Sequence, residues 1–139
     1  MLPADPATCL RARLWDRFVD LSVQDPMQRI VFDPFRPEDR EDRPGVESAE
    51  QRLLQAFEMV DTHMQDRTSA AGDAFGIADC SAAPALFFAG IIVPFGSDRA
   101  ALRGYLERLV ECPSFGRVPV RARPFFGNFP FHDRIPGVP

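Results

Sequence analysis

Apolar positions along the chain recur mainly at steps of three and four residues, which is the period of helices that bury one face. One run spans about Val46 to Arg67 and contains Val46, Ala49, Leu53, Phe57, Val60 and Met64. Another follows Ser97 and Asp98, which can cap a helix, and contains Leu102, Tyr105, Leu106, Leu109 and Val110. No run alternates apolar and polar residues convincingly enough for a strand. The pattern predicts an all-α fold.

The N-terminal region carries two apolar stripes. Asp5 and Pro6 are typical of a helix start, because Asp accepts hydrogen bonds from free amides and Pro is tolerated in the first turn. The first stripe consists of Leu10, Leu14 and Leu21. The second, on a neighbouring face, consists of Trp15, Phe18, Val19 and Ser22. Two stripes indicate contacts on more than one side of this helix, either deep in a bundle or with one stripe facing a ligand cleft or a partner.

Prolines and dense charge mark the places where helices should stop. Pro26 predicts an interruption, because it lacks an amide hydrogen and disfavours helical backbone at the preceding residue; a short continuation should contain Met27, Ile30 and Val31. The stretch from Arg36 to Gly45 predicts an exposed connection, and TSAAGDAF ends the long helix. Pro113 begins a last short helical segment. We expect the Pro- and Phe-rich tail, residues 124–139, to cover the bundle as an extended segment.

The stretch FGIADCSAAPALFFAGIIVPF has a single charged residue between its ends, Asp79. Its length approaches that of a membrane span, but polar residues, Pro and Gly interrupt it, so a buried core helix is the better interpretation. If Gly76 is the N-cap, the carboxylate of Asp79 can accept from the N-cap amide, which is half of a capping box. Phe75 and Cys80 then occupy the hydrophobic-staple positions. A catalytic role for Asp79 is the weaker alternative, because no His, Cys or second acid lies at helical spacing from it.

Composition excludes several classes of function. The net charge is −4, from 20 acidic residues and 16 basic ones, all of them Arg. Acids are interspersed with these arginines, so no basic stripe is available for nucleic acid. The start MLPADPATC lacks the features of a signal peptide. The three cysteines, Cys9, Cys80 and Cys112, have no CxxC spacing, which is typical of a reduced, cytoplasmic protein with buried or partly buried structural thiols.

No residue set is convincing as a metal site or as a catalytic group. His63 and His132 are isolated in the sequence, and no cluster has metal-ligand spacing. No His lies near any of the three cysteines to activate a thiolate. A Gly-rich phosphate loop is also missing from the sequence. We therefore predict neither a catalytic residue nor a bound metal in this chain.

The motif FGIADC, with its helical context, resembles the capping box and staple at the start of the central buried helix in the C-terminal domain of cytosolic glutathione S-transferases. Gly76 departs from the Ser or Thr usual there. LPADPATCLRARLWDRFVD resembles the interdomain linker and first helix of that domain, and ECPSFGRV resembles its last helix. The resemblance covers about Leu2 to Arg123. It implies a bundle of about five helices over residues 1–123, followed by the tail 124–139.

The resemblance also implies a function. In that family a thioredoxin-like domain precedes the helical one, binds glutathione and supplies the catalytic residue. By position, Trp15, Phe18, Val19 and Ser22 would face a hydrophobic electrophilic substrate. Alone, the chain would hold no cofactor and would not conjugate glutathione, which becomes a co-substrate only when the other domain is supplied. The chain would then be a fragment, a sequence with a wrongly assigned start, or a helical half encoded alone, and the resemblance implies a role in detoxification. Without the other domain, an apolar face around Trp15 and Phe18 would be exposed, and such patches usually find partners. We therefore expect a homo-oligomer, a dimer, and no membrane partner.

Two alternatives stay open from the sequence. One is a freestanding helical module for protein interaction, because domains of this type also serve in assemblies. The other is a helical ligand-binding protein of unrelated origin.

Overall fold

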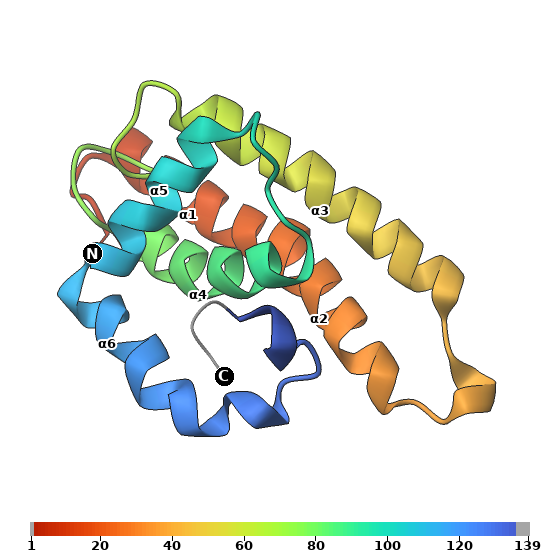
Figure 1. Ribbon diagram of the computed structural model, residues 1–139. Coiled ribbons are helices and arrows are strands. Elements are labelled where there is room, and N and C mark those ends of the chain that lie inside the picture. Colours follow the sequence, from red (N-terminus) through yellow and green to blue (C-terminus); the bar gives the residue numbers. More distant parts are fainter. Residues whose placement is uncertain (1, 136–139) are drawn as a thin grey trace.

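The computed structural model describes residues 2–135, and these residues form an all-α bundle without strands. The α-helices are α1 Pro6–Val19, α2 Asp25–Phe32, α3 Arg43–Met64, α4 Ile77–Ile92, α5 Ala100–Glu111 and α6 Pro113–Ala122. Because α1 continues into α2 through a π turn, the described chain has five helical rods (Figure 1). The predicted all-α class is confirmed.

Helix α4 is the central element of the bundle. It contacts α1, α2 and α5, while α3 packs against α2 and α5 (Figure 1). Small side chains let these neighbours approach closely, since five of its alanines are buried, Ala78, Ala82, Ala83, Ala85 and Ala89. Most of the circumference of α4 is buried, as expected of a core helix, whereas Cys80 and Pro84 are exposed. Within residues 2–135, no helix has both the length and the apolar character needed to span a bilayer.

The predicted interruption before Pro26 is a π turn, Asp20–Gln24, in a rod that stays helical. The Asp25 amide donates to the carbonyl five residues earlier, and the next carbonyl, that of Leu21, cannot receive an amide from Pro26. Arg52 of α3 satisfies it instead: its Nη2 donates to Leu21 O at 2.9 Å, and its Nη1 lies 3.2 Å from Asp25 Oδ2. Asp25 keeps helical dihedrals, contrary to the preference expected before a proline.

The two stripes of α1 have different environments. The second stripe faces inward, since Val19 is buried and its neighbours Trp15 and Phe18 pack against the core. The first stripe faces solvent: Leu10, Leu14 and Leu21 are 70%, 63% and 56% exposed. The interpretation of a helix deep in the bundle is therefore wrong for the first stripe, and the alternative of a stripe that faces a ligand or a partner stays a prediction.

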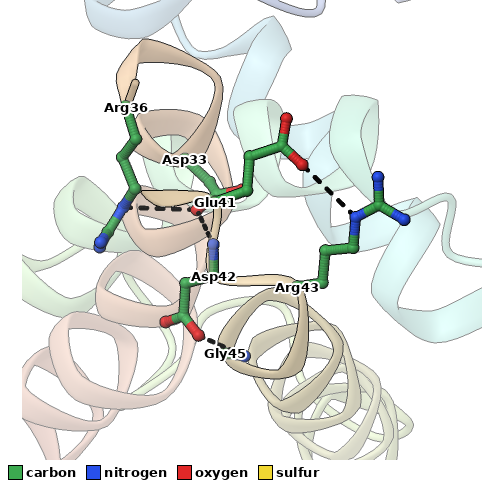
Figure 2. A network of polar contacts seen from close by, with 6 residues as sticks. All are labelled: Asp33, Arg36, Glu41, Asp42, Arg43 and Gly45. Atoms are coloured by element: carbon green, nitrogen blue, oxygen red, sulfur yellow. Dashed lines mark hydrogen bonds and ion pairs between the residues drawn. The ribbon is translucent and has the colours of Figure 1, made fainter. Parts of the chain in front are cut away.

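Two carboxylates order the exposed connection between α2 and α3 (Figure 2). Oδ1 of Asp33 accepts the amide of Asp42 at 3.0 Å and pairs with Nε of Arg36 at 3.3 Å. Oδ1 of Asp42 in turn accepts the amide of Gly45 at 3.0 Å and caps α3. The helix therefore begins at Arg43 and not at Val46, because an Asp cap followed by a Pro in the first turn is a strong start signal.

The start of α5 is capped from another helix. Its N-cap residue is Arg99, which makes no side-chain capping bond, so the predicted cap at Ser97 and Asp98 is wrong. The Leu102 amide donates to Oδ1 of Asp61 on α3 at 2.9 Å. A carboxylate 41 residues earlier thus satisfies one of the free amides at this helix end.

The tail covers the C-terminal half of α4. Its described part forms short 3-10 turns, Arg123–Asn128 and His132–Arg134, in place of a fully extended chain. A second apolar cluster joins the tail to α4 through Ile91, Phe126 and Ile135, with Phe87, Phe88 and Phe129 packed against it. The predicted tail also includes residues 136–139, which lie outside the described residues.

Candidate functional site

Asp79 is the centre of a buried polar network. Its side chain is 1% exposed and accepts three hydrogen bonds. The Gly76 amide donates to Oδ2 at 2.8 Å, the Ala70 amide donates to Oδ1 at 2.9 Å, and the Tyr105 hydroxyl donates to Oδ1 at 2.6 Å. Only the bond to Gly76 follows from the helix-start motif. Asp79 therefore joins the start of α4 to the preceding loop and to α5.

The geometry around Asp79 is that of a network that supports the fold, not that of a catalytic site. Burial, and secondly the bond to Asp79, raise the pKa of the Tyr105 hydroxyl far above its usual range. Tyr105 therefore stays a donor across the physiological range. The cavity beside Tyr105 measures about 10 Å³, which is too small for a substrate. Throughout the described residues, every buried side-chain nitrogen or oxygen atom has a hydrogen-bond partner.

The peptide groups of Ala70 extend this network to α1. Its amide donates to Asp79, and its carbonyl accepts from Nε2 of His63 at 2.7 Å. The His63 ring stacks on Trp15 with centroids 3.8 Å apart and an angle of 24°. Partial burial lowers the pKa of His63, although the bond to Ala70 opposes that shift. His63 is therefore neutral at neutral pH, and its ring supports the Trp15 side chain.

The structure separates the four residues expected to face a substrate. Val19 is 2% exposed and lies in the core, and Trp15 covers His63. Phe18 and Ser22 line a groove of about 110 Å³ between α1 and α3, together with Arg52, Gln55, Ala56 and Met59. The expected substrate contact thus remains a prediction, and Phe18 and Ser22 are the two residues placed to make it.

The staple positions at the start of α4 lie at the surface. Phe75 is 42% exposed and Cys80 is also exposed. Both line a cavity of about 170 Å³ with Ala83, Ser114 and Phe115. The expectation of buried or partly buried thiols is met by Cys9 and Cys112 but is wrong for Cys80, because the staple position of α4 faces outward.

The thiols differ in their surroundings. Partial desolvation, and then the negative charge of Asp79, raise the pKa of Cys80. The Ser114 hydroxyl, 3.2 Å from the Cys112 sulfur, lowers the pKa of Cys112. Residues 2–135 contain no group of three or more His, Cys, Asp or Glu side chains that could hold a metal ion.

Sequence reasoning missed a larger cavity of about 490 Å³ between α4 and α5. Its apolar lining comes from Phe87 of α4, Phe95 of the following loop, and Leu106 and Val110 of α5. The sequence pattern of α5 could have indicated this cavity. The apolar face of this helix is wider than the buried residues Leu102, Tyr105 and Leu109 require, because it also includes Leu106 and Val110. A wide apolar face alone does not distinguish a core contact from a cavity wall.

Comparison with protein families gives one match, to the model described as "Glutathione S-transferase, C-terminal domain", over residues 23–113. Curated protein sequences give no match.

Among solved structures, the fold is similar to a glutathione S-transferase from Methylobacterium radiotolerans in complex with glutathione sulfonate. That likeness has 22% identity and a TM-score of 0.72, and covers 84% of this chain and 56% of that one. Gtt2 from Saccharomyces cerevisiae matches with 21% identity, a TM-score of 0.76, and coverage of 85% and 60%. A glutathione S-transferase from Methylobacillus flagellatus with GSH bound matches with 18% identity, a TM-score of 0.75, and coverage of 84% and 58%. The chain thus spans 56% to 60% of these proteins.

Proposed function

Because this chain belongs to the glutathione S-transferase C-terminal domain family, we propose that it is the helical half that binds the hydrophobic substrate of a glutathione-conjugating enzyme. The family match over residues 23–113 is the observation that carries this proposal. In the reaction, the glutathione sulfur attacks an electrophilic carbon, a carbon–sulfur bond forms, and the leaving group departs. The sulfur must react as a thiolate, and a thioredoxin-like domain would bind glutathione and activate its thiol.

The groove between α1 and α3 is the surface that we propose for the electrophile. Phe18 and Met59 offer apolar area, whereas Ser22, Gln55 and Arg52 offer polar groups at its edge. Arg52 already bonds the carbonyl of Leu21, which fixes its position beside the groove. Since ligand pockets usually measure about 300–1,000 Å³, a groove of 110 Å³ holds only part of a substrate. The glutathione-binding domain would complete the pocket.

The proposal is tested by comparing glutathione with a conjugate that carries an added aromatic group on its sulfur. Calorimetry should show that S-(dinitrophenyl)glutathione binds this chain and that glutathione alone does not. Phe18→Ser should weaken binding of the conjugate, because it removes apolar area from the groove. The control is Phe125→Ser, since Phe125 is 68% exposed and lies on the tail. Retention of the chain on immobilised glutathione would contradict the proposal.

We also propose that the chain self-associates. Leu10, Leu14 and Leu21 form one exposed apolar row along the first rod, and rows of this kind usually mark a contact surface. The partly buried Trp15 and Phe18, which we expected to form the contact, lie on the other stripe. The leucine row is the stronger candidate because each of its side chains is more than half exposed.

A further inference from the structure

The cavity between α4 and α5 shares no residue with the groove proposed for the electrophile. Its volume of about 490 Å³ lies within the usual range for small-molecule sites, about 300–1,000 Å³. Its floor is apolar and includes two aromatic rings, those of Phe87 and Phe95. The Phe87 ring is held edge-on against Phe88 at 5.2 Å and Phe115 at 6.1 Å. The floor is therefore a fixed surface joined to the core.

Two carboxylates form the rim at one end of the cavity. Glu107 and Glu111 lie four residues apart on α5, so they share one face of the helix. Both belong to its C-terminal part, where the carbonyl ends of the helix already create a negative potential. Like charges at this spacing, and acids at this helix end, both destabilise a helix. The ion pairs of residues 2–135 include neither side chain.

The basic residue of the rim is engaged elsewhere. Arg103 donates from Nη1 to Gly96 O at 2.6 Å and from Nη2 to Ser97 O at 3.1 Å. These bonds hold the loop between α4 and α5. Arg103 lies four residues before Glu107 and shares its face of α5, yet the ion pairs of residues 2–135 do not join these two side chains. Two carboxylates and one guanidinium line the cavity, which leaves a formal excess of one negative charge. The two acids stand at a helix end that disfavours them, and functional sites are expected to break local rules of this kind.

We propose that this cavity binds an organic cation with an apolar body. The cationic group lies beside Glu107 and Glu111, and the apolar body packs on Leu106 and Val110. The rings of Phe87 and Phe95 add to the attraction, because an aromatic face favours a cation. Charge complementarity selects a cation over an anion of the same size. This site is independent of glutathione and of the groove between α1 and α3.

The test uses the naphthylmethyl-trimethylammonium cation as the probe and naphthylacetate as the anionic comparison. Amide-resolved NMR of the full chain should show signals of Phe95, Leu106 and Val110 shifting with the cation, and weaker binding as salt increases. The double variant E107Q/E111Q should lower the affinity for the cation by about five- to tenfold, the change expected for two exposed charge contacts. Glu50→Gln, an exposed acid on α3, is the matched control and should change nothing.

Three results would overturn the proposal: equal affinity for the cation and the anion, unchanged affinity of the double variant, or signal shifts confined to other parts of the chain. Circular dichroism of each variant shows whether it is folded. If the double variant does not fold, the salt dependence and the comparison of cation with anion decide the question on the unaltered chain. Loss of binding in the double variant, with the Glu50 control unchanged, supports it.

Discussion

Replacing Asp79 with Ala should destabilise the fold far more than the loss of a helix cap. A cap alone contributes about 1–2 kcal/mol, which is what the sequence motif predicts. In the structure, however, the same carboxylate accepts from Gly76, Ala70 and Tyr105. A buried donor left without an acceptor costs about 1–3 kcal/mol, so losing all three bonds should cost about 3–9 kcal/mol if the three contributions add. A domain is typically stable by only about 5–15 kcal/mol.

Urea unfolding, monitored by circular dichroism, measures this loss of unfolding free energy. Tyr105→Phe removes one of the three bonds and should cost about 1.5–3 kcal/mol, less than Asp79→Ala. Asp66→Ala is the control, because Asp66 is an exposed acid just beyond α3, and it should change stability by less than about 0.5 kcal/mol. A loss below about 2 kcal/mol for Asp79→Ala would mean that Asp79 acts as a cap alone and would refute the network.

Further predictions concern a cross-helix cap, two titrations and an interface. Asp61→Ala should cost about 1 kcal/mol in urea unfolding, because the Leu102 amide loses its acceptor; no change would contradict this cap. Tyr105 is the single tyrosine, and its raised pKa means that stability falls above about pH 10, where the unfolded chain ionises first; tyrosinate absorbance should appear only with unfolding. The lowered pKa of His63 means that its contribution to stability is lost as pH falls below about 6.5, and the fluorescence of Trp15, stacked on His63, should then change in the wild type but not in His63→Gln. Leu14→Arg should convert a dimer to a monomer in sedimentation, and a wild-type monomer would refute the interface.

Local patterns predicted the elements of this fold well because each element carries its own start and stop signals. Asp5 caps α1, with the Thr8 amide donating to its carboxylate at 2.8 Å, and Gly76 precedes α4 as the motif predicts. Periodicity likewise indicated the buried face of α3, from Ala49 to Met64.

Contacts between distant residues could not be predicted from these patterns. The bonds from Tyr105 to Asp79 and from Leu102 to Asp61 join residues 26 and 41 positions apart. Such pairs depend on how whole helices pack. The local sequence around an acid does not indicate whether it will accept a hydrogen bond from a distant residue or face solvent. The leucine row of α1 shows the same limit, because two adjacent stripes fit the helical period and only the packing determines which one is buried.

The candidate sites were predicted less completely than the fold. Phe18 and Ser22 do lie together beside a groove. Val19 instead points into the core, because adjacent positions on a helix point about 100° apart, and Trp15 stacks on His63. The cavity above Phe87 and Phe95 depends on the loop after α4, where Gly96 adopts a positive φ of 79°. A conformation of this kind is favourable for glycine, but the sequence does not indicate which side chains it brings together.

The location of a bound electrophile tests the proposed function most directly. Amide-resolved NMR of the full chain, titrated first with glutathione and then with S-(dinitrophenyl)glutathione, reports both affinity and place. The account predicts that the conjugate shifts signals of Phe18, Ser22 and Met59, which line the groove, and that glutathione alone shifts none of them. Shifts of equal size with glutathione, or a conjugate that leaves these three residues unchanged, would contradict it.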